Sequence, residues 1–256
     1  MRSGTRRSDQ PGQPHVVALA AAAARGEAVE HLPLRLPDGR TVGLRPVRPD
    51  DATALGAWHR GLSVETRRLR FHDDGPDELQ PEQLRGITHV DQREHVAWVA
   101  TTTTEPGTIL ALATYDRVAT PVGAAETAIA VADEWHGLGI GTALFDVLLI
   151  VANHHGIRVL RNFVLRHNRG MHRILDELGG ESQPFSGEVD LVELTVPDDP
   201  DALPVTPSTE VLRRLWHATL AATRPARPVV GRERAPMDTW MDQALTPATD
   251  EGRRPS

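Results

Sequence analysis

The stretch that decides the fold of this chain is AVADEWHGLGIGTALFDVLL, residues 130–149. It carries glycines at three alternate positions, Gly137, Gly139 and Gly141, and an apolar pattern with helical spacing follows at once. Such a pattern is typical of an amphipathic helix that buries one face. We therefore expect a strand to end before the glycines and a long helix to begin among them, over about 141–155.

The glycines point to a ligand at the start of this helix. The first turn of a helix exposes N–H groups that have no partner, and it carries a partial positive charge. Glycines in the preceding loop let an anion such as a pyrophosphate approach these amides closely. Three alternating glycines are entropically costly for a plain turn. The segment therefore predicts a phosphate-binding loop, and a glycine-rich turn without a ligand is the alternative.

Several kinds of site are excluded by residues that the chain lacks. All 28 basic residues are arginine, so the lysine of a Walker-type nucleotide site and Schiff-base chemistry are absent. There is no cysteine, which excludes thiol nucleophiles, disulfides and thiolate metal sites. A dinucleotide-binding fingerprint needs a third glycine where Thr142 stands. No His-Glu-x-x-His occurs, and His154 and His155 are adjacent, so we expect no metal.

Composition also limits the partners and the location of the protein. The net charge of −7 over 256 residues argues against nucleic-acid binding, which needs a basic face. No apolar run reaches the roughly 20 residues that span a bilayer. The alanine-rich stretch near residues 16–25 lacks the leucine-rich centre of an export signal. We therefore expect a cytoplasmic protein that binds neither nucleic acid nor membrane.

The pattern of elements predicts an α/β fold, a mixed sheet with helices on both faces. One domain is expected over 38–198, between a weakly ordered extension, 1–37, and a C-terminal extension, 199–256, with a possible amphipathic helix at 208–222. The expected strands lie at about 41–46, 95–104, 108–119, 124–133, 159–165 and 187–196, and the expected helices at about 52–62, 63–71, 141–155 and 168–180. Asp50 or Asp51 is expected to cap the first of these helices.

Three blocks in register resemble the GNAT superfamily of N-acetyltransferases. The family's Gln/Arg-x-x-Gly-x-Gly/Ala pattern falls on His136, Gly139 and Gly141, with histidine at the first position. The block VLRHNRGMHRILDELGG resembles the later strand–Asn–helix segment and puts Asn168 in the asparagine position. The block GLRPVRPDDATALGAWHRGLSVETRRLRFH resembles the opening of the bacterial protein lysine acetyltransferases, the Pat-like branch.

The resemblance implies a GNAT-like fold in which antiparallel N-terminal strands lead to a parallel pair that splays apart. It implies that the pantetheine arm of acetyl-CoA lies in the gap, against the backbone of residues 129–131, and that Asn168 hydrogen-bonds the cofactor near this arm. The implied cofactor-binding residues are Ile129, Ala130, Val131, His136, Gly137, Leu138, Gly139, Ile140, Gly141, Thr142 and Asn168.

Acetyl transfer to an amine needs a base, because a protonated amine has no lone pair for attack. Glu126 lies in the strand beside the expected thioester, in a position that matches the catalytic glutamate of the branch, and partial burial would raise its pKa. An exposed strand glutamate held in a salt bridge with an arginine is the alternative. The backbone N–H near Val131 is implied as oxyanion donor. No general acid is found: Leu175 holds the tyrosine position of many relatives, and Tyr115, the one tyrosine, lies on another strand.

The sequence thus predicts an acetyl-CoA-dependent N-acetyltransferase that acts by direct attack, with Glu126 as general base. The preferred acceptor, a protein lysine, follows from the branch resemblance alone, and a small-molecule amine is the nearby alternative. A non-catalytic acyl-CoA-binding sensor or partner-binding module is an alternative from a different class. The oligomeric state and any regulation are not predicted.

Overall fold

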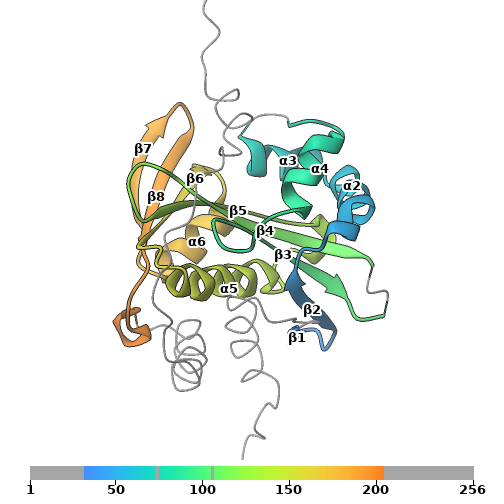
Figure 1. The fold of residues 1–256 in the computed structure, drawn as a ribbon, viewed down its shortest axis with the longest axis horizontal. Helices are drawn as coiled ribbons and strands as arrows, with labels where there is room; N and C mark the ends of the chain where they lie inside the picture. Colours follow the sequence, from blue (N-terminus) through green and yellow to red (C-terminus); the bar gives the residue numbers. More distant parts are fainter. Residues whose placement is uncertain (1–31, 73–74, 105–106, 205–256) are drawn as a thin grey trace, which may run out of the picture.

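The computed structural model describes residues 32–72, 75–104 and 107–204. They form one eight-stranded sheet with the strand order β1-β2-β3-β4-β5-β6-β8-β7 (Figure 1). The strands are β1 (Leu32–Arg35), β2 (Thr41–Pro46), β3 (His95–Thr102), β4 (Ile109–Arg117), β5 (Ala124–Val131), β6 (Val159–Leu165), β7 (Glu181–Ser186) and β8 (Val189–Thr195). The α-helices are α2 (Ala52–Gly61), α3 (Val64–Phe71), α4 (Pro81–Thr88), α5 (Ile140–His154) and α6 (Arg169–Glu177), with 3-10 turns at Pro49–Asp51, Asp133–Trp135 and Pro200–Ala202.

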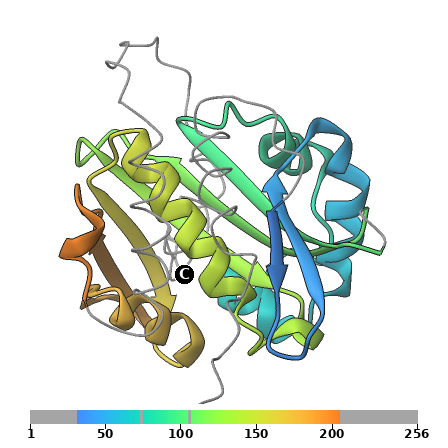
Figure 2. The same ribbon diagram turned by 90° about the horizontal axis from the view of Figure 1, so that it is seen from below.

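The helices cover the two faces of this sheet. Helix α5 crosses one face diagonally, as Figure 2 shows, and α2, α3 and α4 gather on the opposite face (Figure 1). On the first face, buried side chains of α5 such as Leu144 and Leu148 pack with Trp98 of β3, and Leu175 of α6 joins the same core. Each face therefore has its own apolar core, as the predicted mixed sheet requires.

The core on the second face is smaller. It joins Leu55 and Trp58 of α2 to Leu112 of β4 and Ala130 of β5. The strand pattern distributes β5 between the two cores, because successive side chains point to opposite faces. Ala130 belongs to the helix α2 side, and Ile129 and Val131 pack against the α5 side.

The one parallel pairing in the sheet joins β5 to β6. It contains fewer residue pairs than any other strand pairing of the sheet. Register pairs join Ala124 to Val159, Ala125 to Leu160 and Glu126 to Arg161, and there the pairing ends. Strand β5 continues to Val131 and β6 continues to Leu165 without pairing with one another. The predicted splay of the parallel pair is therefore present, and its apex is the pair Glu126–Arg161.

Three elements were not predicted from the sequence: β1, α4 and β7. Strand β1 places the beginning of the sheet at residue 32, inside the extension that we expected to end at 37. Asp51 stands at the N-cap position of α2, as expected, but its side chain makes no capping hydrogen bond to that helix. The Asp51 carboxylate instead accepts from the backbone of Arg48 and pairs with Arg45 at 2.6 Å. The possible helix at 208–222 lies outside the described residues.

Candidate functional site

The glycine loop presents a row of backbone amides without partners in the described structure. Gly137 and Gly139 have φ of 71° and 83°, a left-handed conformation that favours glycine, and Gly139 is the N-cap of α5. The first helical hydrogen bond runs from Ala143 N to Gly139 O at 3.0 Å. Among the hydrogen bonds of the described residues, none uses an N–H from residues 137–142. The loop thus exposes six amides at a helix N-terminus, the geometry that receives an anion.

Two side-chain contacts hold this loop against the sheet. His136 Nε2 donates to the carbonyl oxygen of Val131 at 2.8 Å, which ties the loop to the end of β5. The guanidinium of Arg40 lies 3.9 Å above the ring of Trp135, a cation–π contact. A side chain added at Gly137 or Gly139 would meet no protein atom within 4 Å, so the loop opens to the outside.

The splayed part of β5 offers a second set of backbone groups. Ala124 O and Ala132 N bond toward β4, so even-numbered residues of the strand use their backbone groups on that side. By the alternation of a strand, the N–H and C=O groups of Thr127, Ile129 and Val131 point toward β6 across the gap. Of the predicted strand residues, Ile129 and Val131 thus present amides to the gap, and Ala130 pairs with β4.

The gap forms a narrow slot of about 30 Å³. Residues of both strands line it, together with Leu69, Arg70 and His72 of α3 and Asn168 and Met171 at the start of α6. Asn168 Oδ1 caps α6 by accepting from Met171 N at 3.1 Å. The structure thus places the predicted Asn168 at the slot.

At the apex of the splay, Glu126 belongs to a row of charged side chains that crosses five strands. In register, the row runs His95–Asp116–Glu126–Arg161–Glu193. Arg161 Nη1 donates to Glu126 Oε1 at 3.1 Å, and its Nε lies 3.3 Å from Glu193. The side chains of Glu126 and Arg161 are each 18% exposed. The structure therefore contains the salt bridge of the alternative interpretation. The Glu126 side chain is nevertheless largely buried, and it lies where the gap begins.

The opposite face of the apex is fastened by a polar pair. Thr127 Oγ1 donates to Asn162 Oδ1 across the two strands, and both side chains are buried. Asn162 Nδ2 donates in turn to Leu160 O at 3.3 Å and Val192 O at 3.2 Å. The splay is thus clamped from both faces at adjacent positions of β5, with an ion pair on one side and an amide–hydroxyl pair on the other.

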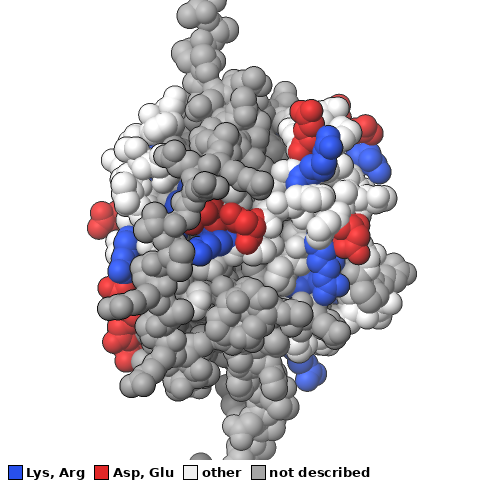
Figure 3. Space-filling model, in the orientation of Figure 1, with Lys and Arg blue, Asp and Glu red and all other residues white. Residues whose placement is uncertain are grey.

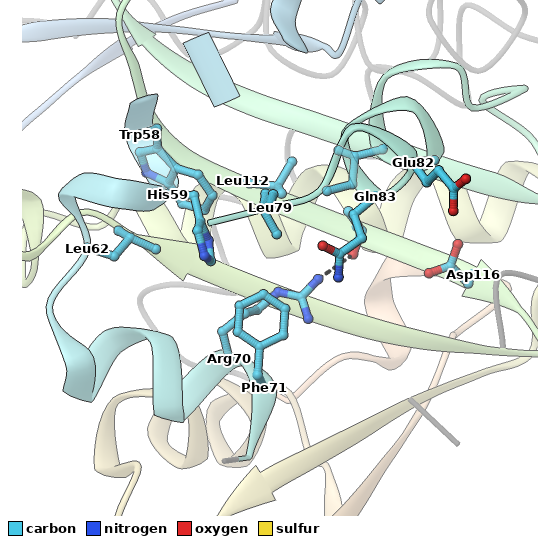
Figure 4. Close-up of a pocket in the computed structure, with 13 residues that line it drawn as sticks. Trp58, His59, Leu62, Arg70, Phe71, Leu79, Glu82, Gln83, Leu112 and Asp116 are labelled. Atoms are coloured by element: carbon cyan, nitrogen blue, oxygen red, sulfur yellow. Dashed lines mark hydrogen bonds between the residues drawn. The ribbon is translucent and has the colours of Figure 1, made fainter. Parts of the chain in front are cut away.

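Helices α2, α3 and α4 enclose a larger cavity on the Glu126 face of the sheet (Figure 4). It measures about 290 Å³, and its floor is β4. Aromatic and aliphatic side chains form most of the wall, and Arg70 and Asp116 bring charge to it (Figure 4). Asp116 is the register partner of Glu126, so the β4 floor of the cavity lies beside the strand that carries the apex.

Helix α3 is tethered at both ends to the two splayed strands. At its N-terminus, the carboxylate of Asp133, just beyond β5, accepts from Ser63 N at 2.9 Å, Ser63 Oγ at 2.6 Å and Thr66 Oγ1 at 2.7 Å. These bonds overcome the desolvation of the carboxylate and lower the pKa of Asp133 to about 2. At the C-terminus of α3, His72 Nε2 donates to Phe163 O of β6 at 2.7 Å. The helix therefore bridges the mouth of the slot.

The remaining candidates from the sequence lie away from this site. Leu175 is buried in the core, and Tyr115 donates to Arg93 O at 3.1 Å and contacts His155 Nδ1 at 2.7 Å. Neither contacts the slot. Within the described ranges, no three His, Asp or Glu side chains are placed to hold a metal ion. None of the helices described combines the length and apolar character needed to cross a membrane.

Acidic and basic side chains alternate on the described part of the face in Figure 3, over α2, α3 and α4, without a large field of one sign.

The sequence did not predict four charged residues of the site: Arg161, Asp116, Arg70 and Asp133. Their partners lie on other strands or helices, so no local spacing signals them.

Comparison with known proteins agrees with this geometry. Residues 60–179 match the model of the Acetyltransferase (GNAT) family. The chain is 30% identical over 195 residues to Acetyltransferase Pat of Mycolicibacterium smegmatis, covering 75% of this chain and 56% of that protein. It is 30% identical over 198 residues to Acetyltransferase PA5475 of Pseudomonas aeruginosa, covering 77% of this chain and 93% of that protein.

A solved structure shows the same fold. The GNAT domain of S. lividans PAT superposes with a TM-score of 0.60 at 27% identity, covering 66% of this chain and 99% of that domain. The eight-stranded mixed sheet, its parallel pair and the flanking helices thus match a known acetyltransferase domain. The chain belongs to the GNAT family of acetyltransferases.

Proposed function

We propose that this protein transfers an acetyl group from acetyl-CoA to a primary amine, with a protein lysine as preferred acceptor. The observation that carries the proposal is the continuity of the site: unpartnered amides at 137–142 lead into a splayed strand edge, which ends at Glu126. The residues present fit coenzyme A, because the amides suit a pyrophosphate and the backbone groups of Ile129 and Val131 suit the amides of a pantetheine arm.

The helix cavity is the proposed entrance for the acceptor. Its apolar wall, with Trp58, Leu62 and Leu112, suits the methylene stem of a lysine. Asp116 lines this cavity and Glu126 is its register partner on β5, so the two neighbouring carboxylates attract an ammonium group. Glu126 then removes a proton from the ammonium group, directly or through water, so that the neutral amine can attack, while Arg161 holds the carboxylate in place. The preference for a protein lysine rests on the resemblance of the opening block to the Pat-like branch.

The test combines binding with turnover. Calorimetry should show coenzyme A binding to the wild-type protein and to Glu126→Gln with similar affinity. Release of free thiol from acetyl-CoA, with lysine peptides and small amines as acceptors, should fall by about 10²- to 10⁴-fold in Glu126→Gln. Glu188→Gln is the matched control, because the Glu188 side chain is 70% exposed and its carboxylate lies 3.9 Å from Arg68.

Three results would count against the proposal. Failure of coenzyme A to bind would remove it altogether. Binding without turnover on any amine, or on proteins of a lysate incubated with labelled acetyl-CoA, would favour a non-catalytic acyl-CoA-binding module. Turnover with small amines but not with lysine peptides would replace the acceptor class.

A further inference from the structure

Arg70 stands between the two cavities of the site. In the described part of the chain it is the residue that lines both the strand slot and the helix cavity. It extends from α3 toward β4, beside Phe71 and opposite Asp116 (Figure 4), and its Nη2 lies 3.4 Å from Thr114 Oγ1. Thr114 is the register partner of Ala128, which lines the slot. The Arg70 side chain thus reaches from the wall of the slot to β4, the strand next to β5.

We propose that Arg70 is a catalytic residue whose guanidinium stabilises negative charge on the reacting thioester, first on its carbonyl oxygen and then on the departing sulfur. This inference rests on the proposed function, since it assigns a role within acetyl transfer. It accounts for a feature of the site that is otherwise unexplained: the structure offers no tyrosine at the slot to protonate the leaving group.

The chemistry produces negative charge in two places in succession. The amine nitrogen attacks the carbonyl carbon, an N–C bond forms, and the carbonyl π electrons move onto oxygen. The C=O bond then re-forms, the C–S bond breaks and sulfur leaves with the bonding pair as a thiolate. Glu126 has taken one proton from the ammonium group before the attack, and the nitrogen's second proton passes to the thiolate, directly or through water, so that amine and thioester give amide and thiol. A fixed cation beside both atoms lowers the energy of both steps.

The surroundings make this cation effective. Desolvation by neighbouring atoms lowers the pKa of Arg70 to about 10, and Asp116 opposes that shift, so the guanidinium keeps its charge at neutral pH. The Phe71 ring lies 5.3 Å from its central carbon. Attraction between charges is stronger in such half-apolar surroundings than in water. The helix that carries Arg70 is fixed at both ends, by Asp133 and by His72, so the charge is positioned in advance.

The first test reads the charge directly from coenzyme A. Absorbance of the thiolate in the near ultraviolet, followed against pH, gives the pKa of the coenzyme A thiol bound to the protein and free in the same buffer. We expect the bound thiol to titrate at lower pH than the free thiol on the wild type. The shift should vanish in Arg70→Gln and be partly kept in Arg70→Lys.

Arg68→Gln is the matched control, because Arg68 lies on the same helix, is 45% exposed and contacts Glu188 at 3.9 Å. It should keep the wild-type shift. In turnover, Arg70→Gln should lower kcat by about 10²- to 10³-fold, the loss typical of one oxyanion donor, with little change in the KM for acetyl-CoA. Arg68→Gln should stay within about twofold of wild type, as expected for an exposed surface residue.

A bound thiol that titrates like the free one on the wild-type protein would overturn the role of Arg70, even if Arg70→Gln failed to fold. An equal shift in wild type and Arg70→Gln would do the same. The proposed function fails in a different way, namely when coenzyme A does not bind or Glu126→Gln keeps full activity. Loss of thiol shift with normal turnover in Arg70→Gln would also reject a catalytic role.

Discussion

Two regions of the same sheet differ in how completely their strands pair. Seven residue pairs join β4 to β5, and seven join β6 to β8, but three join β5 to β6 between them. The unpaired stretches carry strand-favouring side chains, such as Ile129 and Val131 on β5 and Phe163 and Val164 on β6. Poor strand propensity therefore does not explain the gap.

The gap leaves backbone groups that need a partner. Buried or half-buried N–H and C=O groups are nearly always hydrogen-bonded in proteins. In the paired region the neighbouring strand supplies the partner, and at the splay His72 supplies one, for Phe163 O. A ligand that carries amide groups, such as a pantetheine arm, can supply hydrogen-bond partners for the backbone groups on the β5 edge. The difference indicates that the fully paired strands stabilise the fold. At the β5–β6 junction, the side-chain contacts at the apex leave the strand edges open to a ligand.

The largest expected effect lies in the closed region. Trp98 is 1% exposed in the core beneath α5, two strands away from the junction. Trp98→Ala should lower the free energy of unfolding by about 3–5 kcal/mol, measured by urea unfolding, because it leaves a large cavity. Coenzyme A affinity, measured by calorimetry at low temperature where the variant is folded, should change little. If Trp98→Ala lowered coenzyme A affinity but not the free energy of unfolding, the proposed division into a stabilising region and a binding region would be wrong.

The next effect concerns the clamp on the α5 face. Asn162→Leu removes the acceptor of the buried Thr127 hydroxyl and the additional donor that Asn162 Nδ2 gives to Leu160 O and Val192 O. Unsatisfied buried polar groups cost about 1–3 kcal/mol, so stability should fall by that amount. Because the clamp sits at the apex, coenzyme A affinity should fall as well, in contrast to Trp98→Ala.

Asn153→Leu provides the matched control for this variant. Asn153 lies on α5 and donates one hydrogen bond, to Pro197 O at 2.9 Å, away from the slot. It should lose about 0.5–1.5 kcal/mol, the usual worth of one hydrogen bond, and bind coenzyme A normally. Normal coenzyme A affinity in Asn162→Leu would show that the apex does not control the gap.

The closed region was also the part that the sequence predicted best. The long amphipathic helix was expected over about 141–155 and is found at Ile140–His154, since its apolar face has a clear helical period. Strand β7 was missed because its sequence, ESQPFS, is polar, carries a proline and is exposed throughout. Strand β1 was missed because four residues are too few to show a period, and helix α4 because its sequence, PEQLRGIT, has few apolar residues and a glycine.

At the junction, prediction from the sequence worked for backbone features and failed for side-chain partners. The glycine loop and the splay followed from a helix-start signal and a family resemblance, and the structure contains both. The arginine that would pair with Glu126 could not be named, because Arg161 lies 35 residues away and meets it through strand register. Arg70 and Asp116 line the same cavity from a helix and a strand that are far apart in the sequence, so local spacing could not predict this pair either.

The smallest expected effect tests the outer end of the charged row that crosses both regions. His95 Nδ1 lies 2.8 Å from Asp116, and this hydrogen bond, opposed by burial and aided by the charges of Asp116, Asp91 and Glu94, raises the pKa of His95 above its usual 6.5. A raised folded-state pKa stabilises the protein at pH values below about 6.5, and this contribution is lost as pH rises through the folded-state pKa.

Comparing wild type with His95→Gln by urea unfolding at about pH 5.5 and about pH 8.5 isolates that contribution. The loss of stability should be larger at the lower pH, by less than about 1 kcal/mol, because both side chains keep some solvent contact. An equal loss at both pH values would mean that His95 acts through packing alone. A larger loss at the higher pH would require a lowered pKa, which the carboxylate of Asp116 at hydrogen-bonding distance opposes.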